Sequence, residues 1–202
     1  ENQDGIFVLR CRNRTFSNKV VIARYRHSLG LDYSKTLGGL KQFGAEKAFI
    51  TAEGFVIIKS KYDRERDASA LYIGHYDREA NPIGADTLID LAKEFINNGT
   101  WAIEQSANRR YLGFAYIERN SKNKLVLRIK VIDANQNIVS EARAETDLSA
   151  SQYKIDQLMV SPDGNAYVRI ENILARTRDI GPFPYQYKIF RLGHDREEAE
   201  IL

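Results

Sequence analysis

The chain has 202 residues, enough for one domain or two small ones, and 43% hydrophobic with 28% charged residues is an ordinary globular composition. A net charge of +3 lacks the dense basic surface of a dedicated nucleic-acid-binding protein. The single Cys11 excludes a disulfide scaffold, and no apolar run approaches the roughly 18 residues of a membrane-spanning helix.

Short apolar runs separated by turn residues recur along the whole chain, and the 11 tyrosines and 9 phenylalanines favour strands. In chain order the strands are expected at 6–9, 20–25, 48–50, 55–58, 70–76, 101–103, 111–117, 124–132, 138–142, 155–160, 166–170, 185–192 and 199–202, and residues 87–89 could form one more.

The sequence Ser161-Pro162-Asp163-Gly164 gives the clearest turn. Pro162 presets φ for the first corner, and Gly164 tolerates the positive φ of a tight hairpin. Gly5, Gly54 and Arg109 hold the equivalent place in weaker copies, at intervals of about 50 residues. This period, with about four strands in each repeat, predicts an all-β fold of the β-propeller type. The alternative is a meandering β-sandwich or an open sheet.

The repeats divide the chain into units of roughly 1–41, 42–94, 95–150 and 151–202, which we take as a single repeat domain. Unit one begins at its second strand and unit four ends within its outermost strand. This favours an arc of a larger propeller over an unusual closure. The expected partner is therefore a protein or the remainder of a larger propeller.

One segment departs from the strand pattern. In residues 86–99, Asp86 can cap a helix, Leu88, Leu91 and Phe95 share one helical face, and Gly99 suits the position after its end. The alternatives are a short helix, or a strand followed by a helical turn, and propensity favours the helix.

The order of apolar strand, Ser161-Pro162-Asp163-Gly164 turn and strand resembles the TolB-like and WD-like β-propeller repeats of bacterial proteins. The segments 187–192 and 128–135 are similar to the later strands and Asp-rich turns of such repeats. The resemblance implies a secreted, periplasmic or cell-envelope location. It carries no catalytic residue, so no activity follows from it.

Arg10, Arg12 and Arg14 alternate, so an extended strand would place them on one side, where with Arg24 and Arg26 they could bind an anionic ligand. The other reading is a solvated outer strand whose charges discourage edge pairing.

The second candidate binding site is the loop Gly181-Pro182-Phe183-Pro184-Tyr185. Two prolines stiffen it, so Phe183 and Tyr185 would lose little entropy on recognising a partner. Otherwise the two aromatic rings close the edge of the core.

His27, His75 and His194 recur near one turn of their units, as do Asp77, Asp133 and Asp195. Turn chemistry explains them, because equivalent positions on different blades lie too far apart to share a metal. We expect neither a metal nor a cofactor.

The sequence offers no nucleophile elbow and no phosphate-binding glycine loop. The interpretation is a non-catalytic binding or scaffold module that presents its loops to a protein or glycan. The alternative is a propeller-type glycoside hydrolase or lyase with acid and base residues at the central channel.

Overall fold

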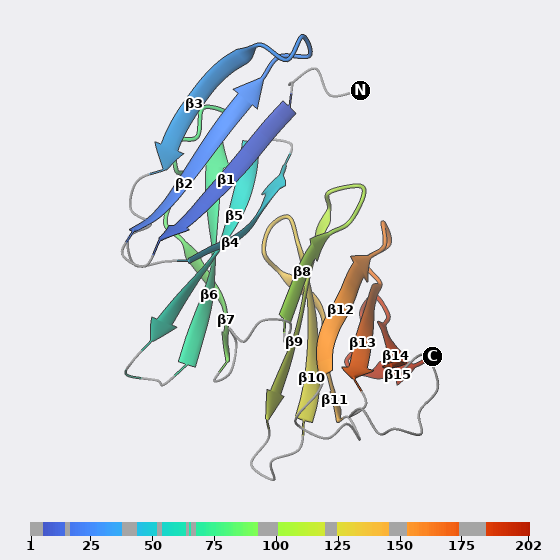
Figure 1. Ribbon diagram of the computed structural model, residues 1–202. Coiled ribbons are helices and arrows are strands. Elements are labelled where there is room, and N and C mark those ends of the chain that lie inside the picture. The colour runs from blue at the N-terminus through green and yellow to red at the C-terminus, as the bar shows by residue number, and fades with distance from the viewer. Residues whose placement is uncertain are drawn as a thin grey trace. The chain divides into compact units, whose positions relative to one another are not determined.

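The computed structural model describes residues 6–14, 17–37, 44–51, 54–63, 65, 68–92, 101–119, 125–145, 153–173 and 185–202. The regular structure of this part consists of strands (Figure 1). Their bounds are β1 Ile6–Arg14, β2 Ser17–Tyr25, β3 Leu31–Leu37, β4 Gly44–Ile50, β5 Gly54–Asp63, β6 Ala68–Asp77, β7 Thr87–Ala92, β8 Trp101–Gln105, β9 Tyr111–Arg119, β10 Leu125–Asp133, β11 Ile138–Glu145, β12 Tyr153–Val160, β13 Ala166–Ile173, β14 Tyr185–Leu192 and β15 Ala199–Ile201.

The strands form four separate antiparallel sheets, each made of consecutive strands. Sheet one is β1–β3, sheet two β4–β7, sheet three β8–β11 and sheet four β12–β15 (Figure 1). Sheet one has three strands among the described residues, and the other three have four. This confirms the all-β class and the repeated up-and-down sheets of a propeller-like arrangement.

The prediction of a helix over residues 86–99 is wrong for Thr87–Ala92. Residues Thr87–Ala92 form strand β7, at the end of sheet two, and residues 93–100 lie outside the described part. Asp86 does not cap a helix. It accepts a hydrogen bond at 2.6 Å from the buried Nζ of Lys59, which lies in β5 of the same sheet.

The chain divides into two compact parts, Glu1–Leu91 and Ala92–Leu202. The first contains sheets one and two apart from Ala92, and the second contains sheets three and four. A single domain over all 202 residues stays a prediction. Where the structure describes the chain, no helix is long and apolar enough to cross a membrane.

The turns that join the last two strands of each sheet have the same pattern of backbone hydrogen bonds. In sheets one to three the amides of Arg26, Asp77 and Asp133 each donate to the carbonyl four residues further on, and their carbonyls accept from the amide three residues on. In sheet four, the carbonyl of Gly193 accepts from the amide of Arg196 in the same way. Arg26, Asp77, Asp133 and Gly193 are therefore equivalent positions.

Four residues before each of these positions the chain has isoleucine: Ile22, Ile73, Ile129 and Ile189. Ile22, Ile73 and Ile129 are 2%, 1% and 0% exposed, whereas Ile189 is 40% exposed. Ile22 packs with Phe55 and Ile57 of sheet two, and Ile129 packs in a core shared by sheets three and four. We call the face of each sheet that carries its isoleucine the isoleucine face.

Sheets three and four pack closely through β9 and β12. A Cβ on Gly113 of β9 would lie 2.5 Å from Cγ2 of Val160 in β12. Val168, Phe190 and Leu192 of sheet four are also fully buried in this core. The glycine thus permits the backbone of sheet three to approach the side chains of sheet four.

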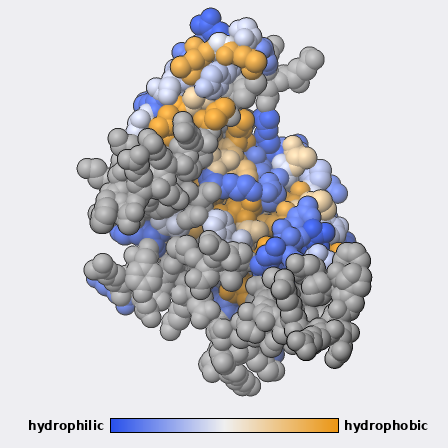
Figure 2. All heavy atoms as spheres, viewed as in Figure 1, coloured by the Kyte–Doolittle hydropathy of each residue, from blue (hydrophilic) through white to orange (hydrophobic). Residues whose placement is uncertain are grey.

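Hydrophobic side chains also reach the surface. Leu29 and Leu31 are exposed at the β2–β3 end of sheet one, where orange residues lie at the top of Figure 2. Tyr187 and Ile189 of β14 are exposed as well. One face of β14 is thus open at Tyr187 and Ile189, whereas Phe190 and Leu192, on its other face, are buried.

Candidate functional site: a charged groove along strand β11

A groove of about 740 Å³ runs along the outer strand of sheet three. Six consecutive residues of β11, Ile138 to Arg143, form one side of it together with Arg128. The segment Asp195–Glu197, which follows β14 in sheet four, forms the other side. Strand β11 is an edge strand and pairs only with β10 among the described residues. The groove therefore lies along a sheet edge that can accept further backbone hydrogen bonds.

Ser140 is the buried polar residue of the groove. It is 4% exposed, and its Oγ has no hydrogen-bond partner among the described residues. A buried hydroxyl without a partner costs free energy, on the order of 1–3 kcal/mol.

A network of ion pairs holds the strand side of the groove. Arg128 of β10 pairs with Glu141 of β11 and lies 3.9 Å from Glu118 of β9. Lys130 lies 3.8 Å from Glu141, and Arg143 lies 4.0 Å from Glu118. These contacts join the three outer strands of sheet three, so the charged side chains are held in place before any ligand arrives.

The opposite side of the groove carries both signs of charge on exposed residues, namely Asp195, Arg196 and Glu197. Asp195 lies 3.3 Å from Nε2 of His194. Arg196 and Glu197 make no ion pair within the part of the chain that is described. Their charges are available to a ligand.

Arg196 also lines a second cavity, of about 400 Å³, with Arg191 and Glu200. Nη1 of Arg191 donates to Glu200 at 2.9 Å, while its buried Nε has no partner among the described residues. Arg196 therefore lines both the groove along β11 and this second cavity.

Three turns fix the position of the segment that forms the outer side. The Nδ2 of Asn108 donates to the carbonyl of Pro162 at 2.8 Å, which joins the β8–β9 and β12–β13 turns. The amide of His194 donates to Oδ1 of Asn165 at 3.1 Å, and the His194 ring packs edge-on against Tyr111. These contacts join the β14–β15 turn to the β12–β13 turn and to the start of β9.

The first predicted binding group lies on β1. Arg10, Arg12 and Arg14 are opposite Val21, Lys19 and Ser17 of β2 respectively. They occupy alternate positions of one strand, as expected, but their side chains are not described. Arg24 and Arg26 pair with Asp32, so these two cations do not present a purely positive surface.

The predicted aromatic site is only partly described. Tyr185 begins β14, opposite Ile173, and Phe183 lies outside the described residues. Binding through Phe183, Tyr185 and the three arginines stays a prediction.

The recurring aspartates form turns. Oδ1 of Asp77 accepts from the amides of Glu79 and Asn81, and its Oδ2 accepts from the Asn81 side chain. Asp133 makes the same three contacts with Asn135 and Asn137. The hydrogen bonds from Asn81 lower the pKa of Asp77. Among the described residues, no group of three or more potential ligands could hold a metal ion.

Sequence reasoning missed the groove because its two sides come from segments more than 50 residues apart. Only Asp195 had been singled out, and as a turn residue. The signal present in the sequence was the alternation of charge at Glu141, Arg143 and Glu145, which begins in the strand expected at 138–142 and continues beyond it.

No protein-family model matches the sequence, and no curated protein is significantly similar to it. Three solved structures have a similar arrangement of strands. The β-propeller domain of the Trilobed protease from Pyrococcus furiosus, with an open velcro topology, has a TM-score of 0.48 at 13% identity. The alignment covers 97% of this chain and 52% of that one.

The other two are an acylaminoacyl peptidase in complex with Z-Gly-Gly-Phe-chloromethyl ketone and the Pyrococcus horikoshii acylaminoacyl peptidase. Their TM-scores are both 0.49, at 12% and 13% identity, and each alignment covers 97% of this chain and 30% of the other. The chain thus spans about half the length of the first structure and less than a third of the other two. Fold similarity alone transfers no activity.

Proposed function

We propose that this protein is a non-catalytic binding module that receives an extended segment of a protein partner in the groove along β11. The observation that carries the proposal is the run of six consecutive edge-strand residues lining one continuous groove. An extended peptide adds to a sheet edge through backbone hydrogen bonds, and its alternate side chains give the specificity.

The chemistry of the groove supports a peptide with charges of both signs. Arg196 and Glu197 stand opposite β11, and the ion pairs of Arg128 and Glu141 hold the strand side in place. A preformed site loses less free energy to ordering when the ligand binds.

A protein segment suits the groove better than a glycan. The edge of β11 offers a row of backbone donors and acceptors at the spacing of another strand, about 4.8 Å away. A glycan has no such regular row and would rely on the side chains of the groove alone.

The test starts from a random 12-residue peptide library displayed on phage and selected against the intact chain. Affinities of the selected peptides are measured for the native protein, for Arg196→Glu and for Arg110→Glu. Arg110 is an exposed arginine of the β8–β9 turn that does not line the groove, so its variant is the matched control. Arg196→Glu should raise the Kd at least about tenfold, and Arg110→Glu should leave it unchanged.

Three outcomes would reject the proposal. The first is that Arg196→Glu and Arg110→Glu bind every selected peptide as the native protein does. The second is cleavage of bound peptides on incubation, which would favour the enzyme alternative. The third is binding of an arrayed glycan, but no peptide, that Arg196→Glu abolishes.

The TolB-like or WD-like identity, and with it a periplasmic, cell-envelope or secreted location, belongs to the same proposal. Its support is the turn Ser161-Pro162-Asp163-Gly164, which lies between β12 and β13 with Gly164 at a φ of 81°. Fractionation of cells that make the full-length protein tests the location. Recovery solely with cytoplasmic markers would contradict it.

A further inference from the structure

The cavity of about 400 Å³ beside the β14–β15 turn is lined by strands of sheet four and by the turn that joins them. Ala199, at the start of β15, packs against the core shared by sheets three and four. Arg191, two residues beyond the exposed Ile189, is opposite Glu200 on the isoleucine face of sheet four. A volume of this size falls within the roughly 300–1,000 Å³ of small-ligand sites, so one amino-acid residue can enter it.

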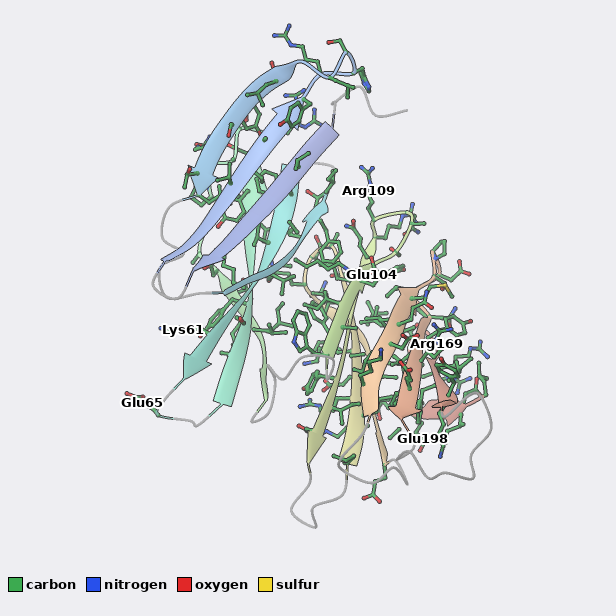
Figure 3. All side chains as sticks on the ribbon, in the orientation of Figure 1. Lys61, Glu65, Glu104, Arg109, Arg169 and Glu198 are labelled. Atoms are coloured by element: carbon green, nitrogen blue, oxygen red, sulfur yellow. The ribbon has the colours of Figure 1, made fainter. Side chains whose placement is uncertain are left out.

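The charges around this cavity include one cation and one anion that have no ion pair within the described residues. Nη1 of Arg191 contacts Glu200 at 2.9 Å, so these two charges balance each other. Arg196 and Glu198 are both exposed, and neither makes an ion pair in that part of the chain. Glu198 directly precedes β15, and Figure 3 shows it beside that strand. The cavity therefore suits a group that carries a negative and a positive charge together.

Arg196 is the residue that this cavity shares with the groove along β11. Its amide donates to the carbonyl of Gly193 at 3.2 Å, and a Cβ on Gly193 would lie 2.9 Å from its Cγ, so the base of the side chain rests against that glycine. The other arginines of the groove, Arg128 and Arg143, each lie within 4.0 Å of a glutamate. Arg196 is therefore the arginine best placed to pair with a carboxylate of a ligand.

We propose that the groove and the cavity together bind the carboxyl-terminal end of a protein whose last residue is lysine or arginine, an inference that rests on the peptide-binding function proposed above. The main chain of that last residue lies in the groove, with its α-carboxylate at Arg196. Its basic side chain enters the cavity and pairs with Glu198. An arginine guanidinium binds a carboxylate through two parallel hydrogen bonds, which gives this end of the peptide a defined position.

A chain end accounts for the two charges better than an internal acidic or basic residue does. An internal residue brings one charge, which leaves either Arg196 or Glu198 without an ion-pair partner in the ligand. A carboxyl-terminal lysine or arginine brings both charges on a single residue, so both are met at once. A free amino acid also carries both charges, but it cannot use the row of backbone groups along β11.

The test uses synthetic eight-residue peptides attached to beads by their amino ends, with seven random positions and a last residue that is lysine, arginine, norleucine or glutamate. Each set is made with a free carboxyl end and with a carboxamide. Binding of the fluorescently labelled intact chain identifies sequences, whose Kd values are then measured in solution. The native chain should bind free lysine or arginine ends at least about tenfold more tightly than their carboxamides, and than norleucine ends.

Two variants at exposed positions separate the contributions of the two charges. Arg196→Gln should lose the preference for a free carboxyl end and keep the preference for lysine over norleucine. Glu198→Gln should lose the preference for lysine and keep that for a free carboxyl end. Arg110→Gln, at an exposed arginine that lines neither the groove nor the cavity, is the matched control and should keep both preferences. Circular dichroism confirms that each variant is folded.

Equal Kd values for free carboxyl and carboxamide ends would overturn the carboxyl-terminal site and leave the proposed function intact, because the peptides still bind. Equal Kd values for lysine and norleucine ends would overturn it as well, and so would Arg196→Gln and Glu198→Gln variants that keep both preferences. Binding of no peptide by the native chain would reject the proposed function, and the carboxyl-terminal site with it.

Discussion

Gly164 adopts a conformation that other residues avoid. Its φ is 81°, and an added Cβ would lie 2.6 Å from Nδ1 of His194. Arg109 holds the equivalent place in the β8–β9 turn with a φ of 62°. A positive φ alone therefore does not exclude a side chain at this turn position.

Gly164→Val should therefore destabilise the protein by about 2 kcal/mol or more, from backbone strain and the contact with His194. The matched control is Gly30→Val in the β2–β3 turn. Gly30 has no positive φ, and its added Cβ would meet only Oγ of Ser28, at 3.7 Å. Thermal unfolding of the two variants decides the matter: equal losses of Tm would contradict the assigned role of Gly164.

Asp77 gives a prediction about pH. Hydrogen bonds from the amide and side chain of Asn81 stabilise its carboxylate and lower its pKa. A lowered pKa means that the stabilisation is complete above the pKa of the unfolded chain, about 3.9, and is lost as pH falls through the folded value. Carboxyl NMR titration should find the Asp77 pKa below 3.9 and raised in Asn81→Ala. An Asp77 pKa that Asn81→Ala leaves unchanged would contradict this account.

The turns were predictable from the sequence because their chemistry is local. The hydrogen bonds of Asp77, Asp133 and Gly164 in their turns all join residues at most four apart in the sequence. The charges of Arg24 and Arg26 were harder to assign, because Asp32, which pairs with both, lies on the next strand.

At the scale of elements, an ion pair between the buried Lys59 and Asp86, the residue before β7, stands where a helix was expected. Nζ of Lys59 contacts Asp86 at 2.6 Å and lies 5.1 Å from the centre of the Tyr76 ring. A Cβ on Gly74 would meet both charged groups at 2.6 Å, so this glycine leaves space for the pair.

Removing only the acid should leave the buried Lys59 charge poorly compensated. We expect Asp86→Ala to lower the free energy of unfolding by about 2 kcal/mol, since part of the Asp86 side chain remains in solvent. Adding Lys59→Met should recover most of this loss, as it removes the charge and keeps an apolar chain of similar length. Urea unfolding of the single and double variants measures the difference. A double variant less stable than Asp86→Ala would contradict the assignment.

The contact between β9 and β12 supports a second prediction. Gly113→Ala places a methyl group against Val160 and should cost about 1–3 kcal/mol. Val160→Ala alone should cost about 2 kcal/mol through the cavity it leaves. In the double variant the two changes should offset each other by about 1 kcal/mol. Additive losses in the double-mutant cycle would mean that the two residues do not touch.

Strands and their pairing order followed from the sequence because apolar runs and turns alternate clearly. The strand at Thr87–Ala92 did not, since the helical period of this segment competes with the contact of Asp86 to Lys59 in β5, which no local pattern reveals. The groove along β11 could not be predicted for a similar reason, because packing between sheets three and four creates it.

At the scale of the molecule, four sheets repeat one register. Ile22, Ile73, Ile129 and Ile189 occupy its equivalent positions, and the last of them is the exposed one. The repetition was visible in the sequence as a period, but the uncovered isoleucine required the register of the strands.

The central claim is that the sheets are equivalent blades, of which the fourth presents an open face. Isoleucine-methyl NMR with a soluble paramagnetic agent tests it in one sample series. In dilute solution the methyl signals of Ile22, Ile73 and Ile129 should be protected, and that of Ile189 should be strongly broadened. Equal protection of all four in the dilute monomer, or broadening of Ile129, would contradict the claim.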